Sequence, residues 1–462
     1  MSEINEVKDF IKFLNLLRQE KIGKNIDPIN IKHFAFNSII NLPIEKKYIH
    51  FLIPKKNGKF RHIFAPNPQL KTIQHTILEI LKAYYSPIPN VTGYVNRKSI
   101  VDNALPHIGK KYILNIDIKD FFTSISGERV YKRLHEPPFN FPDKIAYIIM
   151  RICCEDTSNK LYKKQILYGQ VKSWERIRKH LPQGAPTSPI LSNAVCDKMD
   201  SQIIELCKAF DVTYTRYADD LTFSCMDNVF IKNKKNTITY NNTISIIPVM
   251  PNPWDSESMT PECQNQNTMQ TVQHYDKSTN DFMSELKRII YPFTINNNKT
   301  HLQKKGKHQE VTSLVISDKI NVRKSYIKSL RNILYIWEKY GYSEAEKCFI
   351  KYCLNNNNEI SNTKLNAHLD NVIKGKLDFL KMVRGKDDLL YLNFNKKYEA
   401  LYTELKKNIK SNTNSSVLIK LSNGTKLKCK IINYNIPKSI TIELAGKRQD
   451  IDMNIINSIE EM

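Results

Sequence analysis

Three aspartates in two short segments have the chemistry that phosphoryl transfer needs. Asp219 and Asp220 are adjacent in Tyr217-Ala218-Asp219-Asp220, and Asp117 ends an apolar run far earlier in the chain. Shared carboxylates can hold two divalent ions roughly 4 Å apart, one activating the attacking hydroxyl and the other neutralising the leaving group. Such oxygen ligands suit Mg²⁺. We therefore expect the three aspartates to be catalytic and to bind two Mg²⁺ ions, although a solvated Asp-Asp turn is an alternative for the dipeptide alone.

Short strands and turns must position these carboxylates. Strands are predicted for residues 49–54, 60–64 and 111–116, and for two segments within 212–224 that meet at the Asp219-Asp220 turn. A basic Asn-Gly turn joins the first two strands into a hairpin. Helical spacing of apolar residues predicts helices within 9–42, 141–154, 181–199 and 323–405.

Two further segments differ from this core. From about residue 230 to 280 the chain is rich in Asn, Gln, Ser and Thr and is interrupted by prolines, which predicts a long polar insertion. After a polar linker, residues 417–444 alternate as strands do, around Asn423-Gly424 and Ala445-Gly446 turns. This end of the chain is predicted to form a small β-barrel-like appendage.

Composition limits the class of protein and its partners. The chain has 462 residues, 41% of them hydrophobic, so it can build a large core and is neither disordered throughout nor collagen-like. Because it shows neither a membrane-length apolar run nor a signal-peptide pattern, we expect a cytoplasmic protein without a membrane partner. Seventy Lys and Arg against 46 Asp and Glu give a net charge of +24, which favours a polyanion such as nucleic acid. Compositional bias toward Lys and Asn is the alternative explanation.

Three blocks occur in a fixed order along the chain. They are Leu114-Asn115-Ile116-Asp117-Ile118-Lys119-Asp120-Phe121-Phe122, Leu181-Pro182-Gln183-Gly184-Ala185-Pro186-Thr187-Ser188-Pro189 and Tyr217-Ala218-Asp219-Asp220. Their order resembles the palm of a reverse transcriptase. The resemblance implies an RNA-directed DNA polymerase with the α+β right-hand fold of fingers, palm and thumb, here with the polar insertion and the C-terminal β appendage added.

The same resemblance implies a nucleotide-binding set, namely Lys55, Arg61, Phe122, Gln183, Gly184 and Lys299. Lys55 and Arg61 on the basic hairpin would grip the triphosphate of the incoming dNTP, with a solvated basic turn as the alternative. Phe122 would pack under the sugar and collide with a 2′-hydroxyl. Lys299 would protonate the leaving pyrophosphate.

Two more blocks resemble those of retron reverse transcriptases. Asn103-Ala104-Leu105-Pro106-His107 matches their NAxxH signature, and Val311-Thr312-Ser313 is similar to their VTG region, with Ser313 in place of the usual Gly. The resemblance implies RNA-binding roles for Asn103, His107, Val311, Thr312 and Arg323. A core or capping role is the alternative for His107.

The retron resemblance also implies partners and biology. Such an enzyme is bacterial, binds a dedicated structured non-coding RNA as template and primer, and primes from an RNA 2′-hydroxyl. Its product is single-stranded DNA joined to that RNA, and it serves anti-phage defence, often with a separate effector protein. The alternatives are another defence-linked or group II intron-like reverse transcriptase, or an RNA-binding scaffold that restrains an effector.

The predicted division of the chain follows from these assignments. It comprises N-terminal helices (1–42), fingers (43–110), palm (111–125), fingers and palm helices (126–180), palm with the insertion (181–320), a helical thumb that binds RNA (321–410), and the linker with its β appendage (411–462).

Overall fold

The computed structural model describes much of the chain, in two compact units that span Met1–Lys319 and Ile320–Met462. The described residues are 12, 14–16, 19–20, 42–55, 58, 60–156, 179–231, 281–356, 369–412, 416–421, 425–435, 439–444, 447–452 and 456–461. The predicted insertion, from residue 232 to 280, and most of the predicted N-terminal helices lie outside these residues.

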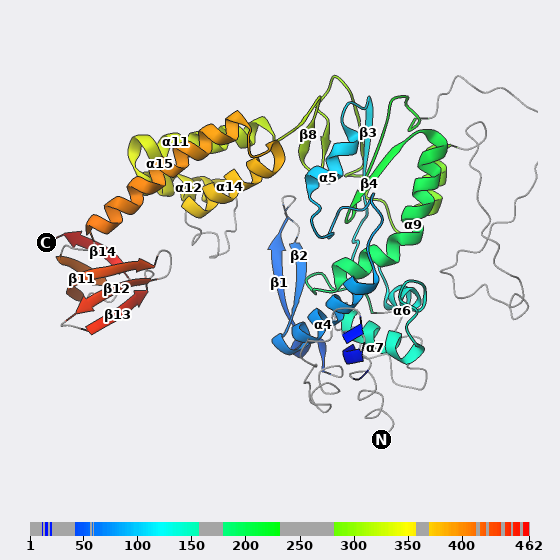
Figure 1. Ribbon diagram of the computed structural model, residues 1–462, viewed down its shortest axis with the longest axis horizontal. Helices are drawn as coiled ribbons and strands as arrows, with labels where there is room; N and C mark the ends of the chain where they lie inside the picture. Colours follow the sequence, from blue (N-terminus) through cyan, green and yellow to red (C-terminus); the bar gives the residue numbers. More distant parts are fainter. Residues whose placement is uncertain are drawn as a thin grey trace, which may run out of the picture. The chain divides into compact units, whose positions relative to one another are not determined.

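The first unit mixes helices with short antiparallel strands (Figure 1). Its helices are α3 (Ile44–Lys47), α4 (Pro68–Tyr84), α5 (Ile100–Ala104), the 3₁₀ turn η1 (Leu105–His107), α6 (Gly127–His135), α7 (Asp143–Cys153), α9 (Ser188–Phe210) and α10 (Phe282–Ile290). Its strands are β1 (Tyr48–Pro54), β2 (Phe60–Pro66), β3 (Tyr112–Asp117), β4 (Thr213–Tyr217), β5 (Asp220–Cys225), β6 (His301–Lys304), β7 (Glu310–Val311) and β8 (Leu314–Ile316). The strands and helices predicted within 49–224 are therefore confirmed.

A four-stranded antiparallel sheet in the order β4-β5-β3-β6 forms the centre of this unit. Its strands are rich in branched and aromatic residues that suit a pleated surface, and Leu221 and Phe223 of β5 are fully buried. Helices α9 and α10 pack on this core, with the Phe282 ring 5.8 Å from that of Phe223 and 5.5 Å from that of Phe210. A buried sheet face of this kind fixes the register of its strands, because a slip of one residue would expose every buried side chain.

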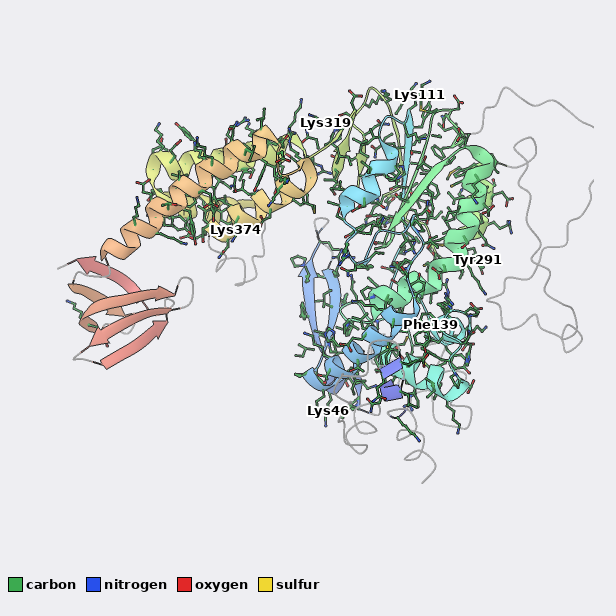
Figure 2. All side chains as sticks on the ribbon, in the orientation of Figure 1. Lys46, Lys111, Phe139, Tyr291, Lys319 and Lys374 are labelled. Carbon is green, nitrogen blue, oxygen red and sulfur yellow. The ribbon has the colours of Figure 1, made fainter. Side chains whose placement is uncertain are left out.

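The hairpin of β1 and β2 begins next to α4 (Figure 1). Helix α4 is capped by the Asn67 side chain, which accepts a hydrogen bond of 2.8 Å from the Leu70 amide. Helices α6 and α7 pack together nearby, and Phe139 between them, labelled in Figure 2, lies 5.6 Å from the ring of Phe141. Most of the hairpin itself is exposed on both faces.

The second unit contains a helical region and a separate sheet. Its elements are β9 (Ile320–Asn321), α11 (Lys324–Tyr340), α12 (Tyr342–Asn356), α14 (Leu369–Arg384), α15 (Leu389–Asn412), β10 (Ser416–Leu421), β11 (Lys426–Asn435), β12 (Ser439–Leu444), β13 (Lys447–Asp452) and β14 (Ile456–Glu461). The predicted helices of 323–405 and strands of 417–444 are confirmed. The five strands form one antiparallel sheet in the order β13-β12-β11-β10-β14, and its closure into a barrel stays a prediction.

None of the helices in the described ranges combines the length and apolar character needed to cross a membrane. The assignment of the two units to fingers, palm and thumb stays a prediction.

Candidate active site

The fold brings the three predicted catalytic aspartates together at one end of the central sheet. Asp117 ends β3 and is the direct antiparallel partner of Asp220, the first residue of β5. The ladder continues past this pair, because the Ile118 amide donates a 2.9 Å hydrogen bond to the Asp219 carbonyl. Ala218, in the turn between β4 and β5, has a positive φ of 59°, which makes this turn tight enough to present two successive carboxylates.

The carboxylates interact electrostatically. Burial raises the pKa of Asp220 to about 6, with further contributions from Asp219 and Asp117. Burial likewise raises the pKa of Asp219, and the nearby Asp117 charge adds to the shift. Negative charges held close together away from bulk water favour their protonated forms unless a cation neutralises them. The cluster therefore has the electrostatic character of a cation-binding site.

Asp117 is held by two side chains from the segment that follows α10. Lys299 Nζ lies 2.6 Å from Asp117 Oδ1, and Asn296 Nδ2 donates a 2.9 Å hydrogen bond to Asp117 Oδ2. The Asn296 amide also donates to the Asp117 carbonyl at 2.8 Å. Although partial burial opposes it, the pKa of Lys299 is raised overall, because this ammonium faces the three carboxylates. Asn296 was not predicted, since an Asn in a polar run carries no distinguishing pattern.

The donor set fits Mg²⁺ as an open site. Within the described ranges, no three His, Cys, Asp or Glu side chains converge on one point to enclose a metal ion. Mg²⁺ nevertheless often binds through one or two carboxylates and completes its shell with water and substrate phosphates. Since both oxygens of Asp117 accept hydrogen bonds, an ion at Asp117 would have to displace the Lys299 ammonium from Oδ1. Asp219 and Asp220 would hold an ion without this exchange.

A buried ion pair fixes the turn that carries Asp219 and Asp220. Arg216 is fully buried and makes a bidentate pair with Asp200 of α9, at 2.8 Å from Nε and 2.5 Å from Nη2. Its Nη1 donates to the Ala218 carbonyl at 3.2 Å and to Asn193 Oδ1 at 3.0 Å. One guanidinium thus ties the strained turn to the long helix beneath it. This pairing could not be predicted from the sequence, because the two residues lie on different elements.

The predicted nucleotide-binding residues surround this centre in part. Arg61 on β2 is exposed, and its charge opposes the rise in the pKa of Asp219, which places it on the side of the carboxylates. Gln183 and Gly184 contact the same strand, because the Phe64 amide donates a 2.8 Å hydrogen bond to the Gln183 carbonyl. Lys55 is exposed just after β1. Its predicted contact with the triphosphate stays a prediction.

Gly184 lies where a side chain would not fit. Its φ is +122°, and an added Cβ would come within 2.7 Å of the Phe64 carbonyl oxygen. Glycine is therefore required for this close backbone approach between the hairpin and the loop before α9. Phe122 is partly buried beyond the end of β3, with its ring 5.5 Å from that of Phe121.

Three of the five predicted RNA-binding residues are buried, and the prediction of RNA contact is corrected for them. Asn103, His107 and Val311 have no exposed surface. His107 lies against the central sheet, where its Nδ1 is 2.7 Å from Ser224 Oγ and its Nε2 is 2.8 Å from Thr215 Oγ1. Burial lowers the pKa of His107 to about 3, so the ring is neutral. The Asn-Ala-x-x-His segment therefore anchors α5 and η1 to strands β4 and β5.

Thr312 and Arg323 differ from these three. Thr312 and Ser313 both have positive φ, 46° and 66°, in the tight turn between β7 and β8. The Thr312 hydroxyl donates to the Ile100 carbonyl at 3.2 Å. Arg323, which precedes α11 in the second unit, is exposed. An RNA contact by these two residues stays a prediction.

Comparisons with known proteins agree with this geometry. Residues 53–239 match the family model described as reverse transcriptase (RNA-dependent DNA polymerase). The retron Mx65 reverse transcriptase of Myxococcus xanthus is 35% identical over 196 residues, which cover 42% of this chain and 44% of that protein. The retron Ec86 reverse transcriptase of Escherichia coli is 35% identical over 180 residues, which cover 38% and 49%. The chain thus spans less than half the length of these two relatives.

Solved structures show a weaker similarity. A telomerase from Candida albicans, in complex with a fragment of telomeric RNA, aligns at 11% identity and a TM-score of 0.33, covering 82% of this chain and 68% of that one. This similarity is too low to carry an argument. The aspartate cluster lies within residues 53–239, the part of the chain that matches the reverse transcriptase family model.

Proposed function

We propose that this chain is the RNA-directed DNA polymerase of a bacterial retron. The observation that carries the proposal is the cluster of Asp117, Asp219 and Asp220 at the end of a palm-like sheet, within residues 53–239 that match the reverse transcriptase family model. Similarity to retron reverse transcriptases supports the retron assignment. The substrates would be dNTPs, and the template and primer a dedicated structured RNA. The product would be single-stranded DNA joined to that RNA through a 2′ branch.

The residues around the cluster support specific roles. Asp219 and Asp220 would hold Mg²⁺, and Asp117 would join them once Lys299 leaves its Oδ1 atom. The bound ions would supply charge neutralisation for the triphosphate and activation of the attacking hydroxyl. Lys299, released from Asp117, would then lie close enough to donate a proton to the leaving pyrophosphate. Arg61 would offset phosphate charge from the hairpin.

The experiment is to express the gene with its flanking DNA, purify the protein and analyse the bound nucleic acid on denaturing gels with RNase and DNase. The test variant is Asp219→Asn/Asp220→Asn. A matched control is Asp211→Asn/Asp227→Asn, which removes two exposed carboxylates from the other end of the same β4–β5 hairpin. We expect branched RNA-linked DNA from the wild type and the control, and none from the test variant.

Other outcomes separate the alternatives. A discrete bound RNA without DNA in any sample would favour an RNA-binding scaffold that restrains an effector. DNA synthesis on added templates without a resident RNA would favour a reverse transcriptase of another kind. A role in anti-phage defence in the bacterial cytoplasm, with a separate effector, is the biological part of the proposal. It predicts that Asp219→Asn/Asp220→Asn abolishes protection in a plaque assay while the control variant retains it.

A further inference from the structure

Tyr94 adopts a backbone conformation that is unusual for its residue type. Its φ is +62°, and it is 47% exposed. A bulky aromatic residue in the left-handed region costs on the order of 1–3 kcal/mol, and such residues concentrate at functional sites. Half-exposed, this ring adds little to the core that would offset the cost.

The segment before Tyr94 is fixed to the turn between β4 and β5 that presents Asp219 and Asp220, which we call the catalytic turn. The Thr92 amide donates a 2.9 Å hydrogen bond to the Arg216 carbonyl, and Asn193 Nδ2 donates to the Gly93 carbonyl at 2.9 Å. A Cβ on Gly93 would collide with the backbone of Ala218 and come within 2.9 Å of the Tyr217 carbonyl carbon. The backbone immediately before Tyr94 is therefore held against the turn that presents Asp219 and Asp220.

The Tyr94 ring neighbours Phe122 and also interacts electrostatically with the carboxylates. Its centroid is 6.0 Å from that of Phe122, at an interplanar angle of 46°. Phe121, which is buried, lies 5.5 Å from Phe122 and 5.9 Å from Phe293. In addition to burial, the charges of Asp219, Arg61 and Asp220 all act on the Tyr94 phenol, with Asp219 raising its pKa and Arg61 lowering it. The Phe122 ring thus contacts the Phe121 ring and the Tyr94 ring, and Tyr94 follows the segment that is bonded to the catalytic turn.

From this arrangement we infer that Tyr94 is a specificity-determining residue that holds Phe122 against the sugar of the incoming nucleotide. Phe122 lies beyond the end of β3, so no strand ladder fixes its backbone. A bulky side chain excludes a 2′-hydroxyl only while it cannot swing aside, and interdigitated rings restrict such movement. The inference rests on the proposed function, and it makes the strained loop part of the selection of deoxynucleotides over ribonucleotides.

The test measures incorporation of one dNTP and of the matching rNTP on a primed RNA template. Tyr94→Asn removes the ring but keeps a residue type that tolerates positive φ, so the loop should keep its conformation. Tyr94→Phe keeps the ring and is the matched control. Phe122→Ala sets the scale for loss of the sugar contact, and Tyr94→Asn/Phe122→Ala completes a double-mutant cycle.

We expect Tyr94→Asn to raise kcat/KM for the rNTP about tenfold relative to that for the dNTP, with Tyr94→Phe close to wild type. In the double variant the effect of Tyr94→Asn should largely disappear, because it acts through Phe122. A damaged fold would lower kcat/KM for both nucleotides, whereas the inference expects kcat/KM for the rNTP to rise. The thermal unfolding temperature of each variant checks independently that the fold is intact.

Two results would overturn the inference. In the first, Tyr94→Asn prefers dNTP over rNTP as strongly as the wild type does, while Phe122→Ala loses this preference. In the second, the effects of the two substitutions on this preference are fully additive in the double variant. Failure of the proposed function is distinguishable, because the wild type would then incorporate neither nucleotide.

Discussion

The surroundings of Asp117 set the charge and the orientation of its carboxylate. Lys299 and Asn296 each engage one of its oxygens, so both the charge and the orientation of this carboxylate are set by the segment after α10. The Lys299 ammonium is 62% exposed and can leave, whereas Asn296 is part-buried and also bonds to the Asp117 backbone. Asn296 therefore acts as the permanent support and Lys299 as the exchangeable one.

This difference gives a prediction for Asn296→Ala. Loss of the Nδ2 donor should let the Asp117 carboxylate rotate and lower the rate of DNA synthesis roughly 10- to 100-fold, the range seen when supports of metal ligands are removed. The measurement is single-nucleotide incorporation at saturating Mg²⁺ and dNTP. Asn297→Ala, an exposed neighbour in the same turn, is the control and should stay near wild type. Equal rates for both variants would contradict the role of Asn296.

His107 gives a prediction about pH and stability. Its pKa is lowered from 6.5 to about 3 by burial, so between these values the unfolded chain binds a proton that the folded chain does not. The stability contributed by the neutral ring is therefore complete above about pH 6.5 and is lost as the pH falls. By linkage the loss should reach about 2 kcal/mol at pH 5.

Urea unfolding at pH 7.5 and pH 5 measures this effect. His107→Gln removes the titrating ring and keeps a donor and an acceptor for Ser224 and Thr215. The variant should have a lower free energy of unfolding than the wild type at pH 7.5. Between pH 7.5 and pH 5, however, its free energy of unfolding should fall by about 2 kcal/mol less than that of the wild type. Parallel losses in the two proteins would show that His107 does not titrate as its burial requires.

At the scale of elements, the contact between the β1–β2 hairpin and the loop before α9 joins the two segments that carry the predicted nucleotide-binding residues. It is made by backbone atoms of Phe64, Gln183 and Gly184. Gly184→Ala would add a Cβ 2.7 Å from the Phe64 carbonyl oxygen, so the hairpin base must move. We expect the KM for dNTP to rise about tenfold or more, since Arg61 moves with its strand.

Gly109→Ala is the matched control for this substitution. Gly109 also has a positive φ, +76°, but an added Cβ would meet no atom within 4 Å. Both variants should lose roughly 1 kcal/mol of stability from the backbone conformation, and only Gly184→Ala should change the KM for dNTP. An equal change in both would assign the effect to general destabilisation.

At the scale of the whole molecule, charge is the dominant property. The net charge of +24 should draw the protein to the phosphates of RNA, and each neutralised phosphate releases counterions. If six or more phosphates are contacted, raising the salt from 50 to 200 mM should weaken RNA binding about 10³-fold. Filter binding over this range measures the slope, and an affinity independent of salt would exclude phosphate contacts as the main source of binding.

Much of the chemistry could be predicted from local sequence. The order of the three blocks predicted that Asp117, Asp219 and Asp220 act together, and the structure places them at one end of the central sheet. Alternation or helical spacing predicted the hairpins and helices that carry them. These signals are visible because each depends on residues within one element or one turn. Gln183 and Gly184 were assigned from the second of these blocks, and Lys55 and Arg61 from the basic hairpin.

Only the tertiary structure decided which side chains meet across elements. Asn103, His107 and Val311 were predicted to contact RNA, but packing of α5, η1 and β7 buries them, and burial depends on neighbours distant in the chain. Asn296 on Asp117, Arg216 on Asp200 and Tyr94 on Phe122 were likewise undetectable in sequence. The sequence by itself predicted which carboxylates come together, and folding determined what holds them, because hydrogen bonds and ring contacts act through space.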